Sequence, residues 1–239
     1  MHQEDFSNAS SISSQTCSLY VKELHQVLQR IGRDYLQMYA CKAILSPLLH
    51  QMSVHLIDLF IRHASILRPM SDSCRSRLVA DSHQIEVIIQ SLLATKLTDL
   101  GVAYKHLKAF RHLLQTSSPF DVDSTSSSSG SEVVDETHYA NVLDESLPYH
   151  VLLHYLFSYA PTDFKSPHQS LNWSVARYSE WLDKHESEKE RLLAIRTCLE
   201  TYVNVVKQKR EKQFATIYPL MFRLLEKGLQ TVMTPSSSS

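Results

Sequence analysis

Glycine is scarce in this chain of 239 residues, with only four: Gly32, Gly101, Gly130 and Gly228. Phosphate-binding loops, βαβ turns and tight hairpins need glycine at backbone angles that other residues rarely adopt. Four isolated glycines supply none of these motifs. Because the chain is also 43% hydrophobic and 21% charged, which is ordinary for a soluble globular protein, the composition favours an all-α protein.

An excess of one charge sign is also missing, because 24 Lys and Arg face 25 Asp and Glu for a formal net charge of −1. This balance disfavours nucleic acid as a partner. The four cysteines, at 17, 41, 74 and 198, form no CxxC pair, so neither a zinc finger nor a thioredoxin-type site is expected. Four free thiols in a reducing compartment are the simpler interpretation.

A long hydrophobic run is absent by inspection of the sequence. The stretch from Val151 to Tyr159 is the most apolar, but it is short and contains His154, whereas a membrane span needs roughly 20 apolar residues. The first five residues are acidic and do not resemble a signal peptide. We expect a cytosolic chain whose contact with membranes is peripheral.

The first half of the chain predicts helices. Residues 1–16 are polar and expected to be disordered, and residues 17–116 are expected to form a helical bundle. Pro47 is expected to separate its first two helices and Pro69 to end the second. Apolar residues then recur at helical spacing from Leu78 to Leu114. They predict one long helix near 73–115, about 40 residues and on the order of 60 Å, which favours an elongated bundle.

The second half begins with a different composition. Residues 117–142 are rich in serine and acidic residues, and residues 118–142 contain no Lys or Arg, so a loop or linker is expected. A C-terminal helical bundle is expected over 143–232, followed by a disordered tail at 233–239. Its helix from Tyr149 to Tyr159 is apolar nearly all round and is expected to be the most buried.

The sequence contains few motifs that indicate metal binding or catalysis. His150 and His154 stand four residues apart, which places two possible metal ligands on one helix face. Val151 occupies the place of the glutamate that a metalloprotease helix requires, and the chain has no Glu-x-x-His pair for a di-iron site. No Gly-x-Ser-x-Gly is present either. We therefore predict no metal, no cofactor, no small-molecule substrate and no enzymatic activity, with the histidines in the core or at an interface.

Two basic clusters remain. Arg62, Arg68, Arg75 and Arg77 lie on either side of Pro69, with acidic residues nearby at 72 and 81 to pair with them. The other cluster comprises Lys207, Lys209, Arg210 and Lys212. Either could contact anionic lipid, where a basic residue adds about 1 kcal/mol, although a solvated surface is the ordinary explanation.

Three stretches in order carry a resemblance to a known family. The first runs from Phe60 to Pro69 and on through residues 77–81. The second runs from Leu147 to residue 161, with Lys-Ser-Pro at 165–167 and Trp173 after it, and the third covers residues 181–192. Together they resemble the C-terminal part of the family of subunit 5 of the conserved oligomeric Golgi complex, over roughly residues 45–230.

The resemblance implies a fold of the helical-rod tethering type and a non-catalytic scaffold role in intra-Golgi retrograde vesicle transport. It implies peripheral association with the cytosolic face of the Golgi membrane. The implied partners are the other subunits, particularly subunit 7, together with SNAREs and Rab GTPases. A generic helical adaptor of another cytosolic complex is the alternative, and a histidine-liganded metalloenzyme is a third hypothesis.

A partner surface on such a scaffold is expected to use arginine and aromatic anchors. The candidates are three residues near the proline and three in the second bundle. The competing interpretation is structural: the arginines fix the turn and the tryptophans fill the core. The six candidates are Arg62, His63, Arg68, Trp173, Tyr178 and Trp181.

Overall fold

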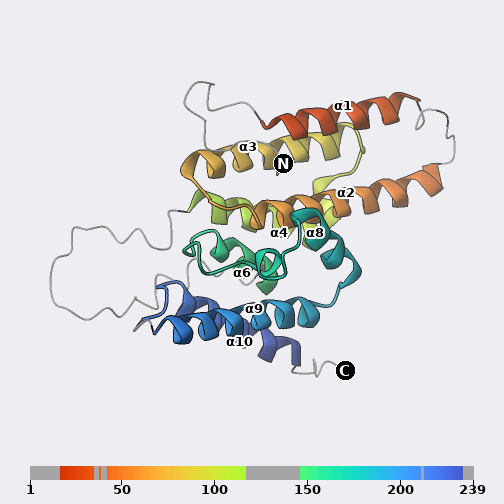
Figure 1. The fold of residues 1–239 in the computed structure, drawn as a ribbon. Coiled ribbons are helices and arrows are strands. Elements are labelled where there is room, and N and C mark those ends of the chain that lie inside the picture. The colour runs from red at the N-terminus through yellow and green to blue at the C-terminus, as the bar shows by residue number, and fades with distance from the viewer. Residues whose placement is uncertain (1–16, 35–37, 39–41, 117–145, 211–212, 234–239) are drawn as a thin grey trace. The chain divides into compact units, whose positions relative to one another are not determined.

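The computed structural model describes residues 17–34, 38, 42–116, 146–210 and 213–233 (Figure 1). Every regular element within these ranges is helical, which confirms the all-α class. The expected disorder at 1–16, the expected linker at 117–142 and, apart from Met233, the expected tail at 233–239 lie outside the described residues. The chain divides into two compact units, one of Gln3–Ile61 with Ser71–Leu147 and the other of Arg62–Met70 with Pro148–Ser239.

The described residues of the first unit form α1 (Leu19–Asp34), α2 (Lys42–Ser65), α3 (Asp72–Ser91), the short 3-10 helix η2 (Leu97–Leu100) and α4 (Val102–Gln115). The last four residues of α2 belong to the second unit. The core of the first unit includes a cluster in which Val21 and Leu28 of α1 meet Ile88 of α3, with Met52 and Leu56 of α2 packed against them. Three helices thus share one apolar centre.

The prediction of one long helix near 73–115 is wrong. Helix α3 ends at Ser91, Ala94 adopts a left-handed conformation with φ 49°, and α4 begins after Gly101, whose φ is 55°. Helices α3 and α4 pack against each other, so the chain folds back on itself. The apolar spacing hid the break because each helix carries its own buried face, and the turn buries Leu93 and Leu100 as well.

The proline expected to separate two helices instead lies within one. Pro47 is inside α2, which begins at Lys42. Proline cannot donate an amide hydrogen bond. Because Pro47 stands near the start of α2, the helix tolerates the loss of this one hydrogen bond and continues. Ala43–Ser65, with mean hydropathy 1.4, is the one described stretch long and apolar enough to cross a membrane. This is weak evidence, since core helices of soluble proteins pass the same test.

The start of α1 is fixed by a buried carboxylate. Asp81 of α3 is fully buried and accepts hydrogen bonds from the Ser18 amide and the Ser18 hydroxyl, each at 2.7 Å, and from the Tyr20 hydroxyl at 2.8 Å. The sequence suggested an arginine partner for Asp81. The other acid considered there, Asp72, does pair with Arg75.

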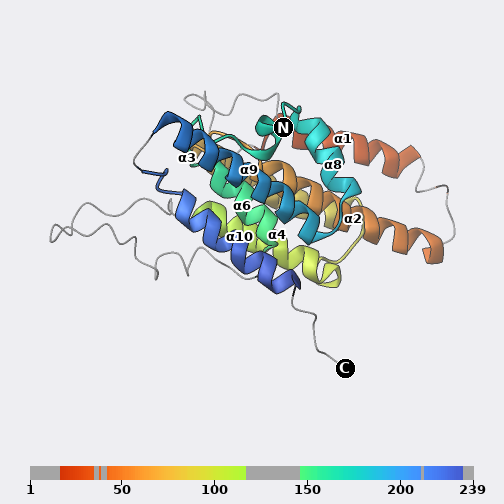
Figure 2. The same ribbon diagram turned by 60° about the horizontal axis from the view of Figure 1, so that its bottom comes forward.

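The described residues of the second unit form α6 (Tyr149–Phe157), α7 (Pro167–Ser170), α8 (Val175–Lys184), α9 (Glu188–Lys209) and α10 (Tyr218–Met233). Figure 2 shows α6, α9 and α10 side by side, and α6 contacts both of the others. Every residue from His150 to Phe157 is buried, which confirms the prediction of a central helix here.

Candidate functional site

All six candidate residues lie in the second unit, and the structure brings the two sets together. Residues 62–70 belong to this unit although they lie far from α8 in the sequence. Ile66 forms a buried cluster with Tyr178 and Leu182 of α8, and Trp173 and Trp181 pack against it. The segment around the proline and the aromatic helix therefore form one continuous region.

Arg62 is a buried residue of this region and forms an ion pair with α8. Its side chain is 8% exposed, and its Nη2 lies 2.6 Å from Asp183 Oδ1 of α8. The pair is not aligned as a hydrogen bond, and Nε has no hydrogen-bond partner among the described residues. A buried guanidinium depends on such a counter-charge, because an unpaired buried charge is strongly destabilising.

His63 joins the same two elements. Its Nε2 lies 2.9 Å from the Ser179 hydroxyl oxygen of α8. Burial, and after it the positive charge of Arg62, lower the pKa of His63, while Asp183 acts in the opposite direction. His63 is therefore neutral near pH 7 and acts as a hydrogen-bonding residue of the interior.

Arg68 holds the chain that follows α6. Its Nη1 donates to the Phe164 carbonyl at 2.9 Å, and its Nη2 donates to the Ala160 carbonyl at 2.5 Å and to the Pro161 carbonyl. A longer bond of 3.3 Å reaches Gln169 Oε1. These contacts match the structural interpretation, in which an arginine fixes a turn, although the turn is the one at 160–164 and not its own.

The aromatic candidates differ in exposure. Tyr178 is 1% exposed, so it supports the surface from beneath. Trp173 and Trp181 are half-buried. The Arg177 guanidinium lies 4.7 Å from the Trp173 ring centre, and the Trp181 ring stacks on His185 at 4.2 Å. Both indoles therefore keep an accessible edge while their orientation is fixed.

A buried polar network beneath these residues was not predicted from the sequence. His154 Nε2 lies 2.8 Å from the Tyr178 hydroxyl, and the His150 and His154 rings meet edge to face at 5.9 Å. Glu188 accepts from the His150 amide at 2.9 Å and pairs with its Nδ1, and Arg191 lies 3.2 Å from its Nε2. The four-residue spacing of the histidines was visible in the sequence, but their partners on α8 and α9 were not.

The protonation of this network follows from its burial. Burial is the main reason why the pKa of His154 lies well below its usual value, and the charges of His150, His168 and Arg191 lower it further. Burial alone would raise the pKa of Glu188, but hydrogen bonds from His150 and the nearby positive charges outweigh it and lower that pKa. The network thus combines a neutral imidazole with an ionised carboxylate.

The described residues were searched for groups of metal ligands and for reactive thiols. They contain no group of three His, Cys, Asp or Glu side chains placed to hold a metal ion. Burial raises the pKa of both the Cys74 and the Cys198 thiols to about 11, so these thiols stay protonated and unreactive. Of the two histidines considered as ligands, His150 contacts Glu188 and Arg191. His154 contacts the Tyr178 hydroxyl through Nε2, while its buried Nδ1 has no hydrogen-bond partner among the described residues.

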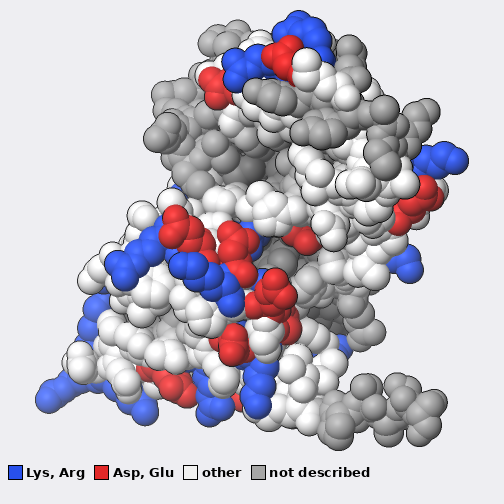
Figure 3. All heavy atoms as spheres, turned by 90° about the vertical axis from the view of Figure 1, so that its right-hand side faces the viewer, with Lys and Arg blue, Asp and Glu red and all other residues white. Residues whose placement is uncertain are grey.

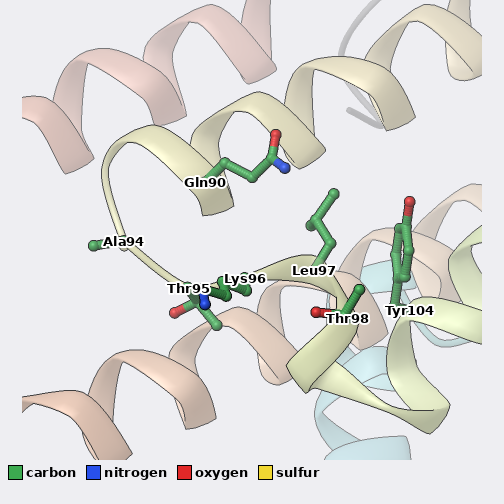
Figure 4. Close-up of a pocket in the computed structure, with 7 residues that line it drawn as sticks. All are labelled: Gln90, Ala94, Thr95, Lys96, Leu97, Thr98 and Tyr104. Carbon is green, nitrogen blue, oxygen red and sulfur yellow. The ribbon is translucent and has the colours of Figure 1, made fainter.

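One cavity, of about 470 Å³, lies in the first unit and contains none of the six candidates. Figure 4 shows Gln90 reaching it from α3, Leu97 and Thr98 from η2 and Tyr104 from α4. Lys96 is the only charged side chain among its lining residues. This lining holds no acid–base pair.

The face of the molecule drawn in Figure 3 is not dominated by charge of one sign. Figure 3 shows basic and acidic side chains intermingled over the described residues of one face. This agrees with the formal net charge of −1.

These observations define an all-helical bundle protein in whose described residues no group of three potential metal ligands is assembled. No family model matches the chain, and no solved structure matches it. Conserved oligomeric Golgi complex subunit 5 of Mus musculus is 38% identical over 97% of this chain, and the Drosophila melanogaster protein of the same name is 30% identical over 97%. The Arabidopsis thaliana protein is 26% identical over 94%.

The chain belongs to the family of conserved oligomeric Golgi complex subunit 5 and corresponds to its C-terminal part. It spans 26% of the mouse protein, 29% of the fly protein and 26% of the Arabidopsis protein. The match extends well beyond residues 45–230, where the sequence motifs placed it.

Proposed function

We propose that this chain is a non-catalytic scaffold segment of a Golgi vesicle-tethering complex. The observation that carries the proposal is 38% identity to a subunit 5 protein across 97% of the chain. The all-helical fold and the absence of a metal-ligand cluster among the described residues suit a role in which surfaces, not chemistry, matter. The alternative of an adaptor in some other cytosolic complex has no observation in its favour.

The proposed setting is intra-Golgi retrograde transport, with the chain held peripherally at the cytosolic face of the Golgi membrane. Its proposed partners are other subunits of the complex, subunit 7 in particular, together with SNAREs and Rab GTPases. The relatives' names support membership of an oligomeric Golgi complex. The individual partners and the direction of transport are part of the proposal.

The proposed subunit-binding surface is the accessible edge of the α8 region, formed by Arg68, Trp173 and Trp181. Tryptophan and arginine are enriched among the residues that dominate binding energy at protein interfaces, and tryptophan buries a large area with only two rotatable side-chain bonds. Here contacts with Arg177 and His185 already restrict both indoles, which reduces the entropy lost on binding. Arg62, His63 and Tyr178 act as supports for this surface.

The test is an affinity pull-down with the full 239-residue chain as bait in cell extract, read by mass spectrometry. We expect other Golgi-complex subunits to be recovered, and their recovery to fall at least about tenfold for Trp173→Ala combined with Trp181→Ala, since a hot-spot residue contributes about 2 kcal/mol or more. Leu171→Ala is the matched control, because Leu171 is 49% exposed just before Trp173.

Two results would contradict the proposal. A folded, helical bait that recovers no Golgi-complex subunit argues against membership of the assembly. Recovery of the subunits of a different cytosolic complex would favour the adaptor alternative. Undiminished recovery with the double tryptophan variant would exclude the α8 edge as the partner surface while leaving membership intact.

A further inference from the structure

The second unit carries another surface, at the junction of α9 and α10. The C-terminal end of α9 and the N-terminal end of α10 lie side by side (Figures 1 and 2). We call it the aromatic–basic end and define it by side chains that line this junction. Its members are Lys207, Lys209, Arg210, Phe214, Tyr218, Phe222 and Arg223.

A ladder of stacked rings runs from the core to this surface. The fully buried Phe164 ring stacks on Tyr202 at 3.9 Å, and Tyr202 contacts Phe214 at 6.4 Å and Tyr218 at 5.8 Å. Phe214 stacks on Tyr218 at 4.8 Å, and Tyr218 on Phe222 at 6.2 Å. The outer rings are thus held by inner ones.

The ladder ends in two phenylalanines that remain largely in water. Phe214 is 43% exposed and Phe222 is 46% exposed. Tyr218, at the start of α10, contacts both Phe214, which precedes the helix, and Phe222, one turn further along it, so the three rings form one row. Stacking on Tyr218 holds the two phenylalanine rings in place. Their exposed parts form an apolar edge at the surface of this unit.

Positive charge surrounds the apolar edge. Lys207, Lys209 and Arg210 are exposed at the end of α9, and Arg223 is exposed beside Phe222. Two described acidic neighbours pair with basic side chains: Asp163 Oδ2 lies 3.1 Å from Lys209 Nζ, and Glu200, a neighbour of Tyr218, pairs with Arg196 at 2.9 Å. Two further carboxylates are near in sequence, Glu226 one turn beyond Phe222 on α10 and Glu211 directly after Arg210. Among its described residues, the surface therefore combines exposed aromatic rings with more exposed basic than acidic side chains.

We propose that the aromatic–basic end binds the anionic headgroups of a phospholipid bilayer. Lysine and arginine pair with lipid phosphates, while aromatic rings favour the boundary between headgroups and acyl chains. An acidic protein segment would satisfy the cations but leave two exposed phenylalanines without an apolar environment. The inference deepens the proposed Golgi role and rests on it for its cellular setting only.

The test is co-sedimentation of the full chain with vesicles, in the absence of any other subunit. One vesicle type contains phosphatidylcholine alone, and the other contains phosphatidylcholine and phosphatidylserine in equal parts. We expect binding to the phosphatidylserine vesicles only, weakened by added salt because screening reduces the attraction between exposed charges.

Two variants separate the contributions. Lys207→Gln with Arg210→Asn should lower partition about 25-fold, since one basic residue near an anionic surface contributes about fivefold. Asn is chosen at 210 because it tolerates the left-handed conformation found there. Phe214→Ser with Phe222→Ser should lower partition about tenfold by removing apolar area.

Matched controls carry the same changes elsewhere in the second unit. Lys184→Gln with Lys189→Gln removes two exposed charges near the start of α9, and Leu193→Ser removes an exposed apolar side chain of α9. Both should bind vesicles as the unchanged chain does. Circular dichroism confirms that each variant is folded.

Several results would overturn the inference. These are no binding to phosphatidylserine vesicles, equal loss in the control variants, or undiminished binding in both test pairs. Polyglutamate is included as a competitor and as a direct ligand. If it binds the aromatic–basic end more tightly than the vesicles do, the occupant is an acidic protein segment. Because no subunit is present, each of these results leaves the pull-down test of the proposed function unaffected.

Discussion

The backbone of Gly228 on α10 lies directly against the ring of Tyr149 on α6. A Cβ atom at position 228 would stand 2.9 Å from Tyr149 Cγ and 3.0 Å from both Tyr149 Cβ and Leu192 Cδ1. Contacts this short are not tolerated between carbon atoms, so α10 approaches the two helices only because residue 228 has no side chain. This glycine sets the spacing of the central helices in the second unit.

Gly228→Ala should therefore destabilise the second unit by about 1–3 kcal/mol, the usual cost of overpacking. In an unobstructed helix the same change stabilises by about 0.5–1 kcal/mol. Urea unfolding followed by tryptophan fluorescence measures the effect. Both tryptophans of the chain, Trp173 and Trp181, lie in the second unit, so the signal reports that unit specifically.

Gly32→Ala is the matched control. Gly32 lies within α1, and nothing stands within 4 Å of the Cβ that would be added. Circular dichroism should show this variant to be unchanged or slightly more stable. A Gly228→Ala variant that is as stable as the unchanged chain would mean that α10 shifts without cost.

Arg68→Met should destabilise the second unit by about 1.5–3 kcal/mol, the range for hydrogen bonds from a charged donor. The substitution keeps an apolar stem but leaves the carbonyls of Ala160, Pro161 and Phe164 without their donor. Tryptophan fluorescence in urea again measures the loss. Arg177→Met, which removes an exposed arginine from Trp173, should change stability by less than about 1 kcal/mol, and an equal loss in both variants would contradict the role given to Arg68.

The sequence predicted the class of fold and the identity of the buried helix because both depend on local pattern. Low glycine content and the spacing of apolar residues can be read from the sequence without knowing which helices pack together. The break between α3 and α4 was invisible because Ala94, a good helix former, adopts the left-handed conformation there. Tertiary packing of the two apolar faces outweighs its propensity.

The candidate site was predicted in parts, but its assembly was not. Arginine and tryptophan can be chosen from the sequence by residue type, yet nothing in the sequence shows that residues near Pro69 meet α8. Ile66 joins Tyr178 and Leu182 across more than 100 positions. The partner of Asp81 was missed for the same reason, since Ser18 is 63 positions away.

Asp81→Asn should loosen α1 from the first unit. An amide in place of the carboxylate keeps one acceptor oxygen but turns the other into a donor, which cannot accept from the Ser18 or Tyr20 hydroxyl groups. Because Asp81 is fully buried, we expect a loss of about 1–3 kcal/mol.

Proteolysis checks this prediction more specifically than a global unfolding curve. Trypsin should cut faster in α1 of the Asp81→Asn variant, after Lys22 or Arg30, both of which are exposed. Asp34→Asn, an exposed acid at the end of α1, is the control and should be cut at the unchanged rate. Equal protection of α1 in the two variants would show that apolar packing holds it without Asp81.

The second unit should lose stability as the pH falls below about 6.5, the ordinary pKa of histidine. Burial lowers the pKa of His154 most strongly, and burial also lowers the pKa values of His63 and His168. The unfolded chain therefore binds protons in a range where the folded one does not, so unfolding is favoured at lower pH. Each such histidine contributes a slope of about 1.4 kcal/mol per pH unit between its unfolded and folded pKa values.

His154→Gln should reduce that slope by about 1.4 kcal/mol per pH unit, measured by urea unfolding with tryptophan fluorescence between pH 7 and pH 5. The variant should also be less stable at pH 7, because its contact with the Tyr178 hydroxyl changes, so the slope and not the absolute stability is the test. His55→Gln, at an exposed position of α2 in the first unit, should leave the slope unchanged.

Glu188 contributes separately, because its lowered pKa adds stability that is lost only when the pH falls through the carboxylate range below about 4.5. A slope that is undiminished in the His154→Gln variant would assign the pH dependence to His63 and His168 and would contradict the role of His154.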